Sequence, residues 1–208
     1  YPAQFIYENL CIQLNVINSS FRFGVRKLLF FASACSYPRE CPQPIKEEYL
    51  LSGPLEPTNE AYAVAKIAGI KMCQAYNKQY GADFICAVPA NAYGPNDNFD
   101  LLDSHVIPAL IRKFHNAKVC KQQTVSIWGT GRALREFIYA DDVADSCVFL
   151  MNNYNSPEII NVGTAKAVSI KELAFCIKDI TGFKGDIVFD SSKPDGMPYK
   201  LLDVAKIN

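Results

Sequence analysis

The chain has 208 residues, half of them hydrophobic, and its 21 Lys and Arg balance its 21 Asp and Glu, so the formal net charge is zero. A chain of this length and composition can bury a substantial core, which excludes a mainly disordered protein. No run of like charge predicts a nucleic-acid surface, and no apolar run approaches the ~18 residues of a membrane span, so a soluble protein is expected.

In the first half, helix and strand signals alternate. Apolar spacing of three to four residues predicts helices, and continuous apolar runs predict strands that are buried on both faces of a parallel sheet. The predicted elements are a helix over 5–21, a strand over 27–34, a Pro-rich loop over 38–59, a helix over 60–80 ending at Gly81, a strand over 83–90 and a loop over 91–100.

In the second half, the elements are shorter and the order of types is less regular. The predicted elements are a helix over 104–117 capped by Ser104, a strand over 124–129, a strand and helix within 135–153, a strand over 158–163, a helix from Ser169 to Gly182 with Glu172 at its third position, a strand over 186–190 and the start of a helix over 201–208. Serine three residues before glutamate is the signature of a capping box.

Together these elements predict an α/β fold with a Rossmann-like doubly wound parallel sheet and a smaller mixed lobe. We expect residues 1–98 to belong to the dinucleotide-binding domain and residues 99–208 mainly to a substrate lobe, with about 124–162 returning to the first domain. The chain does not begin with methionine and ends at the predicted start of a helix, so we expect it to be part of a longer protein, without the first strands of the sheet.

The eight cysteines are scattered, without a C-x-x-C pair and with only two histidines to complete a zinc site. We therefore predict no metal site and read the cysteines as reduced thiols of a cytoplasmic protein, with a disulfide framework as the weaker alternative. They are Cys11, Cys35, Cys41, Cys73, Cys86, Cys120, Cys147 and Cys176.

Tyr62 and Lys66, in "EAYAVAK", lie four residues apart and share one helical face. An ammonium close to a phenol favours the phenolate, so we expect Lys66 to lower the pKa of Tyr62 and make it a proton donor or acceptor. Ser33, near the end of the strand over 27–34, could bond the same substrate oxygen. The alternative is a packed tyrosine, a solvated lysine and a turn serine.

A wider set of segments resembles one family in order and spacing: "SACSYP", "EPTNEAYAVAKIAG", "YGPNDNF", "SHVIPAL", "REFIYADDVA" and "KPDGMPYKLLDV". Together they resemble the GDP-L-fucose synthases, a group within the extended short-chain dehydrogenase/reductase (NAD-dependent epimerase/dehydratase) family. The resemblance covers nearly the whole chain. It implies 3,5-epimerisation of GDP-4-keto-6-deoxy-D-mannose, followed by NADPH-dependent reduction at C4, in a cytoplasmic homodimer.

The resemblance also implies roles for individual residues. Ser33, Tyr62 and Lys66 match the reductase triad, while Cys35 and His105 match the base and acid of epimerisation. Without the resemblance, Cys35 fits an ordinary buried thiol and His105 a helix-start residue, and His115 is read as structural. The residues that match the NADP(H) site are Phe31, Ala32, Ser33, Ala34, Tyr62, Lys66, Pro89, Ala90, Asn91, Ala92 and His105. The residues that match the GDP-sugar site are Lys113, Trp128, Arg135 and Asp195.

The chain departs from the family in its cofactor half-site. The G-x-x-G-x-x-G turn that holds the pyrophosphate on a helix N-terminus is absent, and "WGTG" follows a late strand and does not replace it. Ala34 and Ala90 stand where hydroxyl residues are common, and Lys113 stands where some relatives carry arginine. Two alternatives remain open: another nucleotide-sugar epimerase, reductase or dehydratase of the family, or a non-catalytic relative.

Overall fold

The computed structural model describes residues 1–101, 103–193 and 195–207. Its helices are α1 (Pro2–Arg22), α2 (Glu60–Tyr80), α3 (Val106–Val119), α4 (Ala140–Asn153) and α5 (Ile170–Thr181), with 3-10 turns η1 (Ala34–Ser36) and η2 (Glu47–Tyr49). Its strands are β1 (Lys27–Phe31), β2 (Asp83–Pro89), β3 (Asn91–Tyr93), β4 (Thr124–Trp128), β5 (Leu134–Tyr139), β6 (Ile159–Val162), β7 (Ala167–Ser169), β8 (Asp186–Asp190) and β9 (Tyr199–Lys200).

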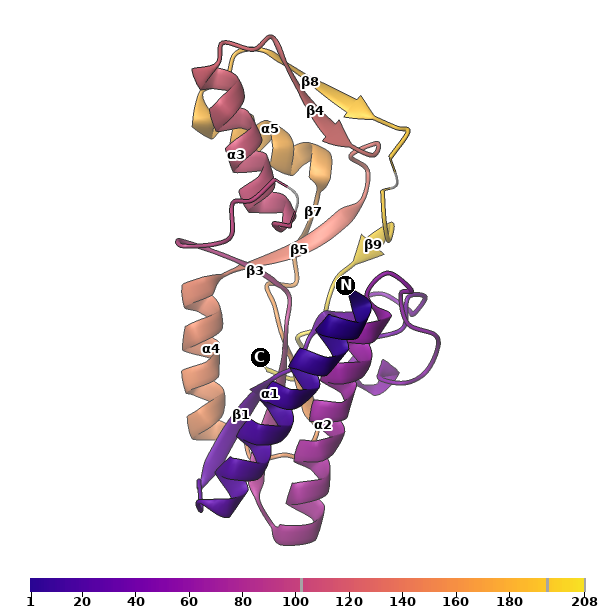
Figure 1. Cartoon of the computed structure of the whole chain (residues 1–208), viewed down its shortest axis with the longest axis vertical. Helices are drawn as coiled ribbons and strands as arrows, with labels where there is room; N and C mark the ends of the chain where they lie inside the picture. The colour runs from indigo at the N-terminus through magenta and orange to yellow at the C-terminus, as the bar shows by residue number, and fades with distance from the viewer. Residues whose placement is uncertain (102, 194, 208) are drawn as a thin grey trace.

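The main body is built on a parallel sheet of order β1-β2-β6. β2 and β6 are buried along nearly all of their length, as their mainly apolar sequences predict for strands covered on both faces; the polar Asn161 of β6 is buried with them. Helices α1 and α2 lie on one side of this sheet and α4 lies on the other (Figure 1). This is the doubly wound α/β arrangement that the sequence predicts.

Helix α2 positions the Tyr62–Lys66 pair, and two glycines shape it. Gly81 ends the helix in the left-handed conformation (φ 67°), which glycine adopts without a steric clash because it has no Cβ. Gly69 lies against the Phe30 ring of β1, and a Cβ at this position would overlap the ring. The close packing that glycine allows sets α2 directly against β1, and therefore sets Tyr62 near the end of that strand.

A second, smaller body contains the parallel pair β4-β8 covered by α3 and α5 (Figure 1). Its own apolar cluster is centred on Phe114 of α3, Ile177 of α5 and Phe183. Ser169 and Glu172 form the expected capping box at the start of α5, in which each side chain accepts a hydrogen bond from the other residue's backbone N–H.

Between the two bodies runs a connecting sheet of order β3-β5-β7, and β9 also pairs with β5. The sequence analysis missed β3, β7 and β9, which are only two or three residues long. The helix expected over 201–208 does not form in its described part, because residues 201–203 run extended and Leu202 bridges Ile45. The Ser104 cap is also wrong: His105 is the N-cap of α3, and the Ser104 hydroxyl is buried instead.

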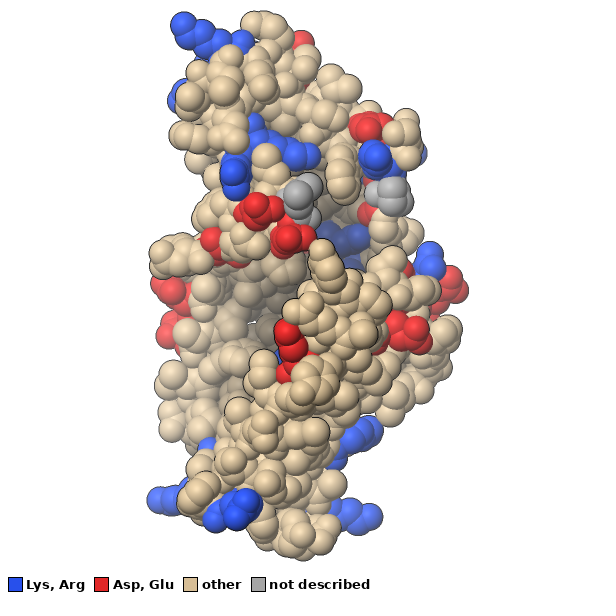
Figure 2. Space-filling model, in the orientation of Figure 1, with Lys and Arg blue, Asp and Glu red and all other residues tan. Residues whose placement is uncertain are grey.

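Charged side chains are scattered over the face shown in Figure 2, and the part formed by α1 and α2 is mostly free of them. Several apolar side chains of α1 are exposed there or nearby, among them Phe5, Ile12 and Val16. Among the residues described, no helix combines the length and apolar character needed to cross a membrane.

Candidate functional site

Ser33 and Cys35 lie just past the carboxyl end of β1, where open parallel sheets bind their ligands. Ser33 is the N-cap of η1, and its Oγ accepts a hydrogen bond from the Cys35 backbone N–H at 3.2 Å. Both residues are partly buried. The same Ser33 side chain faces the Tyr62 phenol of α2 closely enough to act on its pKa, which it lowers. The structure therefore brings together three of the predicted catalytic residues.

Lys66 completes this group from the next turn of α2. Its Nζ donates a hydrogen bond to the Phe31 backbone oxygen at 3.0 Å, and lies 5.7 Å from the centre of the Tyr62 ring and 5.2 Å from that of Phe30. A cation at this distance from an aromatic face is attracted by it. The ammonium is thus held at the edge of the sheet beside the phenol.

The electrostatics of the pair differ from the sequence-based expectation. Burial raises the pKa of Tyr62, while its hydrogen bond with Ser33 acts in the opposite direction and the nearby Cys35 raises it further. Burial lowers the pKa of Lys66. The expected downward shift of the Tyr62 pKa is therefore wrong: the net shift is upward, because desolvation of the phenol is the largest effect.

Lys200 on β9 is a member of this group that the sequence analysis missed. Its Nζ lies 3.9 Å from the Cys35 sulfur. It also faces Cys41, whose pKa is raised by burial and lowered in part by this ammonium. No sequence signal pointed to Lys200, because it is 165 residues from Cys35 along the chain.

The stretches predicted to line the cofactor lie side by side at the same edge. The Ala32 N–H bonds the Ala87 oxygen at 2.9 Å, and the Ala90 N–H bonds the Val162 oxygen at 2.8 Å, so the chain leaves β1 and β2 in parallel. Ala32 and Ala90 are buried; Ala34 and Pro89 are partly buried; Phe31, Asn91 and Ala92 are exposed. Of the exposed members, Phe31 contacts Lys66 through its backbone oxygen, and Asn91 and Ala92 pair with β5.

The residues predicted to hold the nucleotide gather around the ends of β4 and β5. Trp128 is 65% exposed, and the Lys113 Nζ lies 5.7 Å from the centre of its ring. The Asp195 carboxylate accepts hydrogen bonds from the Thr130 backbone N–H (2.6 Å) and the Thr130 hydroxyl (2.7 Å). These bonds lower the pKa of the carboxylate. Burial lowers the pKa of Arg135, and the charge of Asp195 acts against this shift.

His105 stands apart from the Tyr62 group. It is exposed at the start of α3, where its side chain makes no cap hydrogen bond. Within residues 1–101, 103–193 and 195–207, no hydrogen bond joins it to Ser33, Cys35, Tyr62 or Lys66. His115 is exposed on the same helix.

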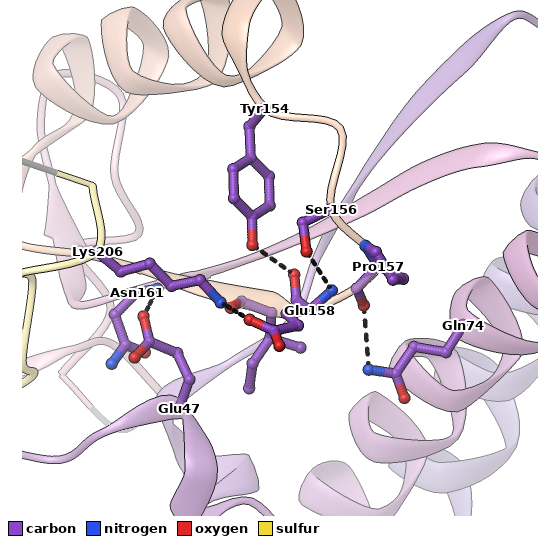
Figure 3. A network of polar contacts seen from close by, with 9 residues as sticks. Glu47, Gln74, Tyr154, Ser156, Pro157, Glu158, Asn161 and Lys206 are labelled. Carbon is purple, nitrogen blue, oxygen red and sulfur yellow. Dashed lines mark hydrogen bonds and ion pairs between the residues drawn. The ribbon is translucent and has the colours of Figure 1, made fainter.

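A groove of about 600 Å³ lies elsewhere, beside the amino end of β6, and contains none of the predicted site residues. A polar network crosses this region (Figure 3): Lys206 binds Glu158 at 2.7 Å, Gln74 donates to the Pro157 oxygen, and Glu47 accepts from the Asn161 N–H. Both lysines and carboxylates line the groove, and among the described residues Lys206 and Glu158 are paired. We read it as a structural contact region between α2, β6 and the end of the chain.

The fold agrees with the comparison to known proteins. The family model described as "NAD dependent epimerase/dehydratase family" matches residues 1–163. The chain belongs to this family. The family resemblance of the sequence is thereby confirmed.

Individual members of the family are similar over nearly the whole chain. A GDP-L-fucose synthase of Sinorhizobium fredii is 59% identical over 206 residues, which are 99% of this chain and 66% of that protein. The chain thus spans about two thirds of the length of this relative.

Solved structures show the same fold. A GDP-6-OMe-4-keto-L-xylo-heptose reductase from C. jejuni has a TM-score of 0.94 at 42% identity, covering 100% of this chain and 71% of that one. A GDP-L-fucose synthetase from Naegleria fowleri bound to NADP has a TM-score of 0.95 at 33% identity, covering 99% of this chain and 66% of that one.

Proposed function

We propose that the protein is a GDP-L-fucose synthase, which epimerises GDP-4-keto-6-deoxy-D-mannose at C3 and C5 and then reduces C4 with NADPH. The observation that carries this proposal is the meeting of Ser33, Tyr62 and Lys66 with the Cys35 thiol at one sheet edge. The 59% identity to a GDP-L-fucose synthase supports the choice of substrate.

For the reduction, Tyr62 is the proton donor to O4 of the sugar. Its raised pKa keeps the phenol protonated at neutral pH, which is the state that an acid needs before the transfer. Ser33, whose side chain faces the Tyr62 phenol, orients the same oxygen. Lys66 holds its positive charge beside the phenol and stabilises the phenolate that forms.

For the epimerisation, Cys35 removes the protons at C3 and C5. These protons are acidified by the C4 ketone between them, because their loss gives an enolate. The Lys200 ammonium lies 3.9 Å from this sulfur, on the side where the thiolate charge is carried during proton removal. The family resemblance assigns the returning acid to His105, whose exposed side chain is free to approach a bound sugar.

The residues present fit the nicotinamide half of NADP(H). Phe31, Asn91 and Ala92 offer an exposed rim, and the Lys66 ammonium is a donor suited to ribose hydroxyls. When bound, NADPH supplies the hydride for C4. No glycine-rich turn for the pyrophosphate occurs in this sequence, so the fit concerns the nicotinamide half alone.

The nucleotide would bind at the exposed Trp128. An indole face can stack on a base or sugar, and the Lys113 ammonium beside it suits a diphosphate. Arg135 adds a second cation, and the Asp195 carboxylate, held by Thr130, accepts from a hydroxyl or an amine.

We also propose that the protein is a cytoplasmic homodimer, formed through α1 and α2. Ile12 of α1 is 64% exposed, and Phe5 and Val16 of the same helix are about half exposed. Val64 of α2 is 41% exposed. A two-fold pairing of these helices would bury the apolar side chains in a four-helix contact.

The test is incubation with GDP-4-keto-6-deoxy-D-mannose in deuterated water, with and without NADPH. We expect deuterium at C3 and C5 in both cases, and NADPH consumption giving GDP-L-fucose. Cys35→Ala should lose the labelling, whereas Tyr62→Phe should keep the labelling and lose the reduction. Reduction without labelling would favour a C4 reductase, such as the C. jejuni relative, and the absence of both signals would favour a non-catalytic relative.

A further inference from the structure

Glu136 on β5 is a buried carboxylate to which the proposed chemistry assigns no role. It is 2% exposed, and among the described residues it forms no ion pair with a lysine or arginine. A charged group in such a place needs hydrogen-bond donors to replace water. In this structure the donors come from the backbone.

The first set of donors is the turn after β6. Glu136 Oε1 accepts from the backbone N–H groups of Thr164 (2.6 Å) and Ala165 (2.7 Å). Ala165 has a positive φ of 55°, so the two successive N–H groups point into one concave site. Such a backbone nest binds an anion, and here it binds the carboxylate of the protein itself. Gly163 completes the fit, because a Cβ there would overlap Oε1.

The second donor is the segment that follows β9. Glu136 Oε2 accepts from the Leu202 N–H at 2.9 Å. Two residues earlier, Lys200 is paired with Arg135 in the register of β5 and β9, and its Nζ reaches the Cys35 sulfur. β9 has only two residues, and this side-chain bond is one of its anchors, beside the bonds of Leu201 to Gln43 and Ile45.

We propose that Glu136 is a positioning residue, which holds β9 in place and thereby keeps the Lys200 ammonium against the Cys35 thiol. It links the proposed nucleotide site, through its neighbour Arg135, to the proposed base of the epimerisation. Its backbone oxygen also accepts from the Asn91 amide at 2.9 Å, which joins the cofactor rim to the same point. The inference rests on the proposed function only for the role of Cys35.

The test is the rate at which iodoacetamide alkylates Cys35 at pH 7, measured by peptide mass spectrometry on the purified protein. Only the thiolate reacts, so removal of the ammonium slows the reaction. At ~4 Å in bulk water the interaction of an ammonium with a reacting thiolate is about 1 kcal/mol, or about fivefold in rate, partly offset by a more nucleophilic sulfur when the charge is removed. We expect Lys200→Gln to slow the alkylation about two- to fivefold.

Glu136→Gln keeps the size of the side chain but turns an amide N–H₂ toward the backbone donors. We expect it to slow the alkylation as much as Lys200→Gln, and the double variant to be no slower than either single variant. General loosening of the fold would instead expose the partly buried thiol and speed the reaction. The exposed Glu48→Gln is the matched control and should leave the rate unchanged.

An unchanged or faster rate in Glu136→Gln, or additive slowing in the double variant, would overturn the proposal. If Glu136→Gln does not fold, Gly163→Ala provides the same comparison, because the added methyl displaces the carboxylate without removing its charge. The assay needs neither substrate nor cofactor, so its result is independent of whether the enzyme reaction itself is found.

Discussion

The side chain of Asn161 ties three distant segments together in the core, and its loss should be among the most costly single changes in the main body. It is fully buried on β6. Its Oδ1 accepts from the Tyr37 hydroxyl at 2.6 Å, and its Nδ2 donates to the backbone oxygens of Ile45 (2.9 Å) and Asp203 (3.0 Å). The Asn161 backbone N–H also donates a hydrogen bond to the Glu47 carboxylate (Figure 3).

Asn161→Leu conserves volume but removes three hydrogen bonds. It leaves the buried Tyr37 hydroxyl unpaired, whereas the Ile45 oxygen still accepts from the Asp203 N–H and Asp203 is only partly buried. Two lost bonds at about 0.5–1.5 kcal/mol each, with the unpaired hydroxyl at about 1–3 kcal/mol, give an expected loss of about 2–6 kcal/mol from the free energy of unfolding. This is a large part of the roughly 5–15 kcal/mol that is typical of a folded protein. Burial and the nearby Glu47 raise the pKa of Tyr37, whereas its hydrogen bond with Asn161 lowers it. The Tyr37 hydroxyl is therefore the partner that the replacement of Asn161 affects most.

The assay is urea unfolding followed by far-ultraviolet circular dichroism. Trp128 is exposed and belongs to the α3–α5 body, so its fluorescence would not report on this core. Tyr37→Phe should cost about 1–3 kcal/mol, and the double variant should cost less than the sum, because no hydroxyl is then left unpaired. The exposed Asn152→Ala is the control. A loss below about 1 kcal/mol for Asn161→Leu, or strict additivity, would refute this reasoning.

Three further predictions concern the site. Tyr62→Phe should lower the C4 reduction rate about 10²- to 10⁴-fold while NADPH binding, measured by fluorescence titration, stays within a few-fold; equal loss of both would contradict a role as acid. Because burial raises the pKa of Tyr62, its phenolate absorbance, taken as wild type minus Tyr62→Phe, should appear only above pH 10, and later still in Ser33→Ala, which removes the opposing hydrogen bond. A signal near pH 8 would be inconsistent with this sign. Trp128→Ala should weaken GDP binding about fivefold or more by calorimetry with little change in melting temperature, because the ring is 65% exposed; unchanged affinity would place the nucleotide elsewhere.

The periodic and capped elements could be predicted from the sequence because their causes are local. Helix α2 ends at Gly81 since only glycine adopts the left-handed cap without strain, and α5 begins at the Ser169–Glu172 box. The continuous apolar runs of β1 and β2 predict strands of a parallel sheet, and the carboxyl ends of such strands lie at one edge. For this reason the sequence alone predicts that Ser33, Tyr62 and Lys66 lie together.

Tertiary contacts decided the rest. Strands β3, β7 and β9 are too short to carry a pattern of their own, and they form because β5 offers them a partner. Lys200 meets Cys35 across 165 residues of sequence, and the direction of the Tyr62 pKa shift depends on how deeply α2 buries the phenol. The sequence by itself determined the α/β layout and the tyrosine–lysine pair, because helix periodicity and caps act over a few residues. Only the folded chain decided which charges face Cys35 and Tyr62, because burial and long-range strand pairing are properties of the whole packed molecule.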